Sequence, residues 1–337
     1  MIEDMPTDAD RTDDLPLLFG RVLDGAGGAR HIAWAEVQDW APARDGEVLW
    51  LHLLRDHPGV QQWLQDHLGV PDPTAELLTS DATRPRAFRE GETLVATLRG
   101  INFNPGAAPE DMLSIQLWCD GVRVVTLRRA ALQTPRLVAD DLDAGKGPVD
   151  AGSLVTAVTE HLIDRMSPAI VDMNAMIDEL EAEDAEKDTD GTLDRIATIR
   201  RNCLALKRHM SPQHEALMAI STGAPAWFED HDRREIAESI ARLRRYLDDI
   251  DISKESALVL QDDIRARAAA NTQRTQYVLA VVAGVFLPLT FITGLLGINV
   301  GDIPLAHQGS HGFWIVAGLC VVILAVEVLL LRRLKWV

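Results

Sequence analysis

Two long apolar runs near the C-terminal end constrain this chain more than any other feature. Residues 277–296 contain no charged side chain, and residues 313–331 contain one, Glu327. A helix rises about 1.5 Å per residue, so about 20 residues are enough to cross a hydrocarbon core of about 30 Å. The sequence therefore predicts two membrane-spanning helices.

Basic residues flank these two runs on one side only. The connecting loop has no Lys or Arg, whereas the outer flanks carry Arg274, Arg332, Arg333 and Lys335. Because cytoplasmic flanks are enriched in Lys and Arg, we expect both termini in the cytoplasm and the loop outside. The opening segment, MIEDMPTDADRTDD, is acidic and has no apolar core, so we expect no secretory signal.

The part of the chain before the spans is long and acidic. It holds about 275 residues, enough for more than one cored unit. With 49 acidic and 30 basic residues it carries a formal charge of −19, against −18 for the whole chain, which repels nucleic acid and attracts cations, although solubility alone also explains it. The cysteines are far apart and form no CxxC pair, so we expect structural roles in a reducing compartment for Cys119, Cys203 and Cys320.

We expect residues 1–15 to be disordered and residues 16–147 to form a cytoplasmic α/β domain. The segments with strand patterns are FGRVLD, EVLWLHLL, ETLVATLRGINF and MLSIQLWCDGVRVVTLRR. In the last of these, Asp120-Gly121 predicts a hairpin turn. Between the strands, GVQQWLQDHLG and PTAELLTSD have helical patterns.

Residues 148–276 carry a helical pattern instead. Apolar residues recur at spacings of three and four, which predicts one helix that ends at DTDG, 188–191; they are Leu162, Met166, Ile170, Met173, Ile177 and Leu180. We expect a second helix from near Thr192 that is interrupted or capped again at Ser211-Pro212, and a loop around GAPAW, 223–227.

A third helix is predicted to be far longer than the others. No Pro or Gly occurs between Asp232 and Gly284, and an apolar stripe leads straight into the first span. One continuous helix over residues 232–296 would be roughly 100 Å long. We expect Pro288 to kink it at most, because membrane helices tolerate proline. The region 277–337 then holds both spans and a basic C-terminus.

One face of the first span is narrow and partly polar. It is made of Gln273, Gln276, Ala280, Ala283, Leu287, Thr290 and Gly294. Small residues also mediate packing between membrane helices, so an ordinary packing seam is the alternative to a pore lining. Two spans per chain cannot enclose a water-filled path. A pore would therefore require several copies of the chain, each contributing this face.

The tripeptide Gly297-Ile298-Asn299 lies where the first span ends, at the outer mouth of such a pore. A ring of Asn299 amide oxygens can accept hydrogen bonds from the waters around a divalent cation, and so bind it without removing its hydration shell. An amide achieves this with less risk of trapping the ion than a carboxylate. Gly294 and Gly297 allow close approach of the backbones.

These residues resemble the CorA superfamily of divalent-cation transporters, whose members carry a Gly-Met-Asn signature at this position. The isoleucine and the following Val300-Gly301-Asp302-Ile303-Pro304 are similar to its ZntB branch, which is associated with zinc. Three further segments resemble that branch: LDGAGGARHIAW near the N-terminus, LDDIDISKESALVLQDDI in the long helix, and the terminal RRLKWV. The resemblance extends over much of the chain.

The resemblance implies a homopentamer with a funnel-shaped cytoplasmic domain, placed in the inner membrane with a central pore. It implies transport of zinc. We expect this transport to proceed without ATP hydrolysis and without a cofactor, and we expect no enzymatic activity, because the sequence has no P-loop motif and no catalytic grouping. A magnesium or broad divalent channel is the alternative, since no conventional zinc site of Cys, His and carboxylate occurs in the span. A membrane-anchored scaffold or sensor is an alternative of another class. The direction of transport and coupling to protons stay open.

Other candidate sites are weaker. Asp302, His307 and His311 in the outer loop are candidates for attracting cations, although the histidines can equally be solvated loop residues. Glu327 invites a role in proton coupling, but its position near the cytoplasmic surface favours pairing with Arg332 or snorkelling. The acidic runs at 178–186 and 248–251 are candidates for regulatory metal binding, with a solvated helix face as the simpler interpretation. We find no catalytic grouping and no P-loop motif.

Overall fold

The structure, a computed structural model, describes residues 15–182, 189–297 and 310–333. The chain divides into two compact units: unit 1 comprises Met1–Asp184 and Asp190–Leu260, and unit 2 comprises Ala185–Thr189 and Gln261–Val337. The segment expected to be disordered, residues 1–15, lies outside the described residues except for Leu15.

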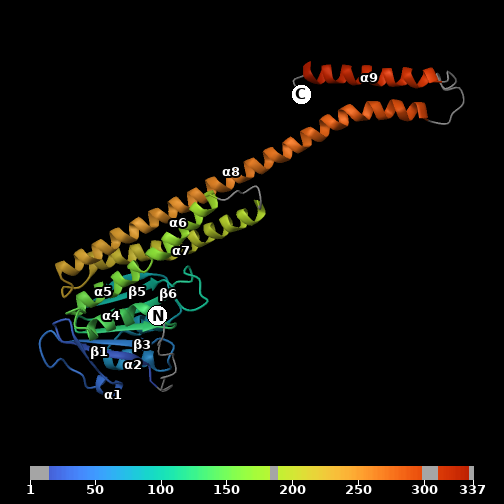
Figure 1. Cartoon of the computed structure of the whole chain (residues 1–337). Helices are drawn as coiled ribbons and strands as arrows, with labels where there is room; N and C mark the ends of the chain where they lie inside the picture. The colour runs from blue at the N-terminus through green and yellow to red at the C-terminus, as the bar shows by residue number, and fades with distance from the viewer. Residues whose placement is uncertain (1–14, 183–188, 298–309, 334–337) are drawn as a thin grey trace. The chain divides into compact units, whose positions relative to one another are not determined.

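A seven-stranded sheet forms the centre of unit 1 (Figure 1). Its strands are β1 (Leu17–Leu23), β2 (Ala29–His31), β3 (Val48–Leu54), β4 (Arg86–Glu90), β5 (Thr93–Gly100), β6 (Leu113–Cys119) and β7 (Arg123–Arg128). Their order across the sheet is β2-β1-β3-β7-β6-β5-β4. Neighbours are antiparallel except β3 and β7, which are parallel. The predicted hairpin at Asp120-Gly121 is confirmed by the antiparallel pairing of β6 and β7.

Helices cover both faces of this sheet. One face packs against α1 (Trp34–Val37), α2 (Val60–Leu68) and α3 (Asp72–Thr79) in a single apolar core. Alternate residues of β3 point into that core, namely Leu49, Leu51 and Leu53. The other face meets α4 (Gln133–Asp143) and α5 (Ala151–Asp164). The predicted α/β character of this region is therefore confirmed.

A polar group of three residues lies buried between β3 and β7. Thr126 Oγ1 accepts a hydrogen bond from Trp50 Nε1 at 3.0 Å and lies 2.9 Å from His52 Nδ1. The same hydroxyl donates to the carbonyl oxygen of Leu51. Burial, together with the nearby charge of Arg128, lowers the pKa of His52 to about 3. The His52 ring is therefore neutral in the folded protein at neutral pH.

This buried histidine predicts loss of stability on mild acidification. The unfolded chain takes up a proton near pH 6.5 and the folded chain does not until about pH 3, so stability falls as the pH drops below 6.5. Between pH 6.5 and 5 the loss should be about 2 kcal/mol. Urea unfolding followed by tryptophan fluorescence checks this, with His52→Gln as the variant that lacks the titrating group. An equal pH dependence in both proteins would contradict it.

Three further helices follow: α6 (Ser167–Ala182), α7 (Thr189–Gly223) and α8 (Asp230–Gly297). The single helix expected through Leu162 and Leu180 is in fact two, because the chain turns at Arg165 and Met166 between α5 and α6. Pro168 follows the turn, and proline disfavours helical backbone in the residue before it. The apolar stripe continues across the break, since Met166 and Ile170 are both buried.

The predicted interruption of the helix at Ser211-Pro212 does not occur, so this prediction is wrong. Helix α7 continues through Pro212, although an interior proline costs about 3 kcal/mol. The next residue, Gln213, is fully buried and exchanges two hydrogen bonds with the Arg99 backbone of β5. Burial of Met210 and Leu217 on the same helix adds apolar contact. Packing against the sheet therefore holds the helix together at this point.

The prediction of one very long helix is confirmed, since α8 has 68 residues and contains Pro288 without a break. Within unit 1 its buried face includes Ile236, Leu243 and Ile250. Unit 2 holds the rest of α8 and α9 (Ser310–Arg333), which lies alongside it (Figure 1). Among the described helices, α8 and α9 are the ones long and apolar enough to cross a membrane.

Candidate ion pathway

The predicted signature begins at the end of α8. Gly297 is the last residue of this helix and is exposed. A side chain placed on Gly297 would meet no atom within 4 Å, so its surroundings are open. Ile298, Asn299, Asp302 and His307 lie outside the described residues, and His311 is in the first turn of α9. The geometry of the outer mouth therefore stays a prediction.

The predicted pore-lining face lies entirely on α8 and is solvent-exposed along its whole length. Its members are Gln273, Gln276, Ala280, Ala283, Leu287, Thr290 and Gly294. Leu287, the largest apolar side chain of the set, is 67% exposed. No residue of unit 2 that the structure describes buries this face. We call these seven residues the stripe.

Packing inside unit 2 uses the other side of the helix. The half-buried residues of the span are Val281, Val285, Pro288, Leu289 and Ile292. At about 100° per residue, this set points roughly opposite to the stripe. The half-buried residues of α9 also recur at spacings of three and four; they are Val316, Ala317, Cys320, Ile323, Glu327 and Leu331. The stripe is thus left free for contact with other copies of the chain or with water.

Two threonine hydroxyls on the span donate their protons to the helix backbone, which leaves their oxygens available as acceptors. Thr290 Oγ1 donates to the carbonyl of Phe286 at 2.8 Å, one turn earlier. Thr293 Oγ1 donates in the same way to Leu289 at 3.0 Å. Because the hydroxyl proton is used by the helix, the oxygen lone pairs of Thr290 remain free on the stripe. Such an oxygen can accept from the waters around a cation.

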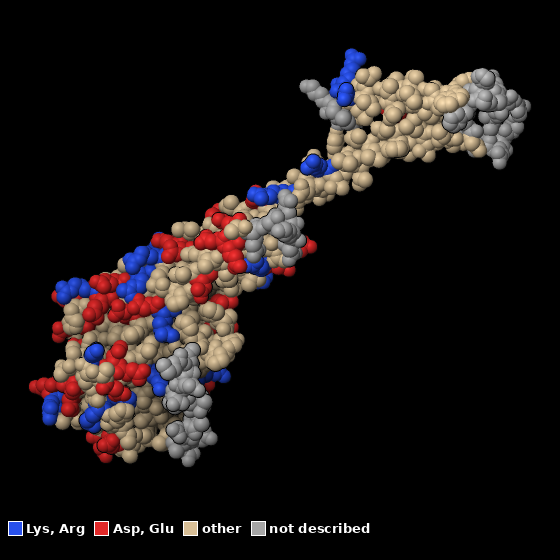
Figure 2. All heavy atoms as spheres, in the orientation of Figure 1, with Lys and Arg blue, Asp and Glu red and all other residues tan. Residues whose placement is uncertain are grey.

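Charge is nearly absent from the spans. Figure 2 shows charged side chains gathered over the part of the chain before the spans, with the two apolar helices carrying almost none. The exception is Glu327, which is half-buried. Its Oε2 atom is buried and has no hydrogen-bond partner among the described residues, and no ion pair joins it to Arg332 there. The expected pairing with Arg332 is therefore absent from the described structure.

The two acidic runs contain residues with basic partners. Asp251 forms an ion pair with Lys207 at 2.6 Å, and Asp248 with Arg244 at 3.3 Å. In the first run, Glu179 pairs with Arg195 at 3.1 Å. These contacts join or support helices α6, α7 and α8. They favour structural roles over metal binding at these carboxylates.

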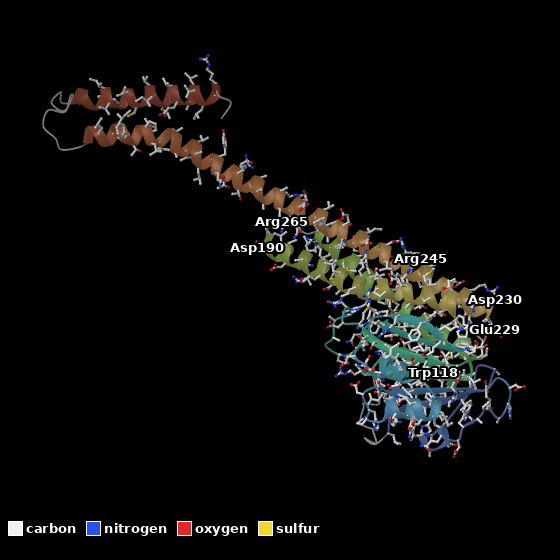
Figure 3. The ribbon with its side chains drawn as sticks, turned by 180° about the vertical axis from the view of Figure 1, so that it is seen from behind. Trp118, Asp190, Glu229, Asp230, Arg245 and Arg265 are labelled. Atoms are coloured by element: carbon white, nitrogen blue, oxygen red, sulfur yellow. The ribbon has the colours of Figure 1, made fainter. Side chains whose placement is uncertain are left out.

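One polar cluster was not identified from the sequence. Asp150 at the start of α5 meets His231 and Asp232 at the start of α8, and one ligand atom from each lies within 4.8 Å of the others. Figure 3 labels the adjoining residues Glu229 and Asp230. The loop before α8 is held in place by Trp227, whose Nε1 donates to the carbonyl of Glu92 at 2.8 Å. Its ring also packs so closely on Gly121 that a side chain there would clash.

Comparison with known proteins identifies relatives over nearly the whole chain. A family model described as CorA-like Mg2+ transporter protein matches residues 45–333. The divalent cation transporter CmaX of Pseudomonas aeruginosa is 37% identical over 329 residues, covering 96% of this chain and 98% of that protein. The zinc transport protein ZntB of Pectobacterium atrosepticum is 33% identical over 314 residues, covering 93% and 94%.

A solved structure shows the same fold. The structure of the full-length CmaX protein aligns with a TM-score of 0.83 at 35% identity, covering 95% of this chain and 98% of that chain. The alignment includes the two candidate membrane-spanning helices as well as the sheet, since so little of either chain is left out.

Proposed function

The chain belongs to the CorA-like Mg2+ transporter family, and from this premise we propose that it moves divalent cations, zinc in preference to magnesium, through a pore made by copies of α8. The observation that carries the proposal is the exposed stripe on the side of α8 opposite the packing face. A helix that served only as an anchor would need no such narrow, partly polar face. The family assignment likewise favours transport over a scaffold or sensor.

Five copies of the chain would form the pore. Two spans cannot surround a water-filled path, so the stripe of one chain must face the stripes of others. The number five comes from the resemblance to homopentameric CorA transporters. Each chain would contribute Ala280, Ala283, Thr290 and Gly294, whose small or hydroxylated side chains leave room for hydrated ions. The remaining faces of α8 and α9 would contact lipid in the inner membrane.

The entrance would be formed by Gly297, Ile298 and Asn299. Amide oxygens of Asn299 would bind the ion through its hydrating waters, which suits passage because the ion is not held directly. Asp302, His307 and His311 would raise the local concentration of cations outside. The transported ion is the substrate of the protein, and no resident cofactor is required for this step.

Zinc is proposed as the preferred ion on two grounds. The signature has isoleucine where the magnesium-associated pattern has methionine, and several relatives at 31–33% identity are named zinc transport proteins. A broader divalent range, including magnesium, is the second candidate. The support for this second candidate is that CmaX, which is 37% identical to this chain, is named a divalent cation transporter.

The proposed driving force is the ion gradient or the membrane potential, because the sequence contains no P-loop motif for ATP. Protein reconstituted in liposomes should admit Zn2+, detected by an enclosed zinc-sensitive dye, without ATP. Membrane potential and pH gradient are imposed separately, so that proton coupling appears as a response to the pH gradient alone. Absence of zinc entry under every imposed gradient would contradict the proposal.

A further inference from the structure

We infer that Asp150, His231 and Asp232 form a second, resident divalent-cation site in unit 1, with a preference for zinc over magnesium. The three residues come from two helix starts that are far apart in the sequence, and their ligand atoms converge within 4.8 Å. The site is distinct from the transport pathway, since it lies before the spans. It would join the first turn of α8 to α5.

Both aspartates cap a helix, but each needs only one oxygen to do so. Asp150 Oδ1 accepts from the backbone N–H and the hydroxyl of Ser153, both at 2.7 Å. Asp232 Oδ2 accepts from the backbone N–H of Glu229 at 2.8 Å. Helix capping therefore accounts for the position of one oxygen of each carboxylate. The second oxygen of Asp232, Oδ1, is buried and has no hydrogen bond among the described residues.

The second oxygen of Asp232 is the observation that points to a ligand. The Asp232 side chain is 0% exposed, and its buried Oδ1 makes no hydrogen bond of good geometry; the polar atom beside it is His231 Nε2, at 3.1 Å. Burying a carboxylate oxygen without a hydrogen bond is costly unless a cation meets it.

The backbone of α5 leaves space for this carboxylate at Gly152. A Cβ atom placed on Gly152 would lie 2.0 Å from Asp232 Oδ2, so only glycine permits the approach. The close packing fixes Asp232 beside the start of α5, where Asp150 is located. Two carboxylates are thereby held together, which only a cation or a proton between them makes favourable.

His231 supplies a nitrogen ligand from the open side. Its Nε2 lies 3.1 Å from Asp232 Oδ1, close to the separation of about 3.3 Å between ligands around a tetrahedral zinc ion. Its Nδ1 lies 3.6 Å from a carboxylate oxygen of Glu229. In metal-bound histidines, the N–H of the other ring nitrogen usually donates a hydrogen bond to such a carboxylate, which orients the ring. The His231 side chain is 41% exposed, so ions can reach the site from solvent.

The donor set determines the class of ion. One imidazole nitrogen and two carboxylate oxygens suit Zn2+ and leave a fourth position for water. Mg2+ prefers six oxygen ligands and loses its waters reluctantly, so an imidazole disfavours it. The positive ends of the two helix dipoles oppose any cation by about 1 kcal/mol or less each, and the two carboxylates outweigh this.

The test measures bound Zn2+ per chain for the full-length protein in detergent, equilibrated with buffered micromolar Zn2+ alone. The wild type should bind one more Zn2+ per chain than His231→Gln, and millimolar Mg2+ should not displace it. His231 is half-exposed, so the substitution should leave the fold intact, which circular dichroism checks. Glu229→Gln should weaken binding about tenfold by loosening the ring. His161→Gln is the matched control, because His161 lies 3.4 Å from one carboxylate, Asp141, outside the cluster.

Equal zinc content in wild type and His231→Gln would overturn the inference and leave the two aspartates as helix caps. The measurement is repeated with Asn299→Ala, in which the proposed entrance is lost. Retention of the extra zinc in that variant is expected, because the resident site does not depend on transport. Its loss there would show that the zinc was held at the entrance, and would also overturn the inference.

Discussion

Zinc entry into liposomes should fall to the protein-free leak rate when Asn299 is replaced by alanine. The substitution removes the amide oxygens that the proposed entrance offers to the hydrated ion, two residues after α8 ends at Gly297. The apolar spans and the core of unit 1 are unchanged, so assembly should persist. Dye-reported zinc entry and particle mass in detergent, measured on the same preparation, separate loss of transport from loss of assembly.

Asn299→Asp is the informative companion. It keeps the size and the acceptor geometry of the side chain but adds up to five negative charges at the mouth of a pentamer. Capture of the ion should improve while release slows, which gives a lower half-saturating zinc concentration together with a lower maximal flux. Normal zinc entry in a correctly assembled Asn299→Ala protein would show that the tripeptide is only a structural turn.

A phenylalanine at position 283 should block flux, whereas one at position 282 should not. Ala283 is on the stripe, so Ala283→Phe places a large ring from every copy into the proposed pore. Val282 is about 100° further around the helix and 47% exposed, on the side assigned to lipid. Val282→Phe therefore adds the same ring where membranes tolerate apolar bulk. Because both variants introduce the same ring one residue apart, a difference between them reports which side of the helix faces the pore.

Flux and mass are again measured together. Ala283→Phe should leave a pentamer of normal mass with flux reduced to a small fraction of wild type, and Val282→Phe should behave as wild type in both. Equal loss of flux in the two variants would place the stripe in a packing seam instead of a pore. A clean monomer for the wild type would defeat the pore model altogether.

Periodicity predicted the elements that bury a regular apolar face. The strands β3, β5, β6 and β7 and the whole of α8 were identified because their apolar residues repeat at the period of the element. Strands β2 and β4 were missed, since they are short, largely polar edge strands. The parallel pairing of β3 with β7 joins residues more than 70 positions apart, and local pattern carries no information about such a contact.

Local rules failed where tertiary packing decided the outcome. Pro212 predicted a helix interruption, but Gln213 binds the β5 backbone and holds α7 together. Conversely, the apolar repeat through Leu162 and Leu180 concealed the turn before Pro168. Both errors come from judging a segment without its neighbours. The stripe of α8, by contrast, depends only on helical spacing, so its members could be grouped from the sequence, and its role as a pore lining stays a prediction.

The cluster of Asp150, His231 and Asp232 could not be found in this way. Its residues are some 80 positions apart, and each aspartate alone has the pattern of an ordinary helix cap. Only the fold shows that the two carboxylates and the histidine converge and that Gly152 makes room for the carboxylate of Asp232. The Gly-Ile-Asn signature is the opposite case. Its chemistry is proposed from sequence, and the residues after Gly297 lie outside those that the structure describes.

The most direct test of the account compares zinc and magnesium entry into the same proteoliposomes. Wild-type protein is reconstituted with an enclosed dye for each ion, and both ions are presented at equal free concentration under the same membrane potential. We expect zinc to enter faster than magnesium, and Asn299→Ala to abolish the entry of both. Robust magnesium entry without zinc entry would contradict the assignment of zinc as the preferred ion.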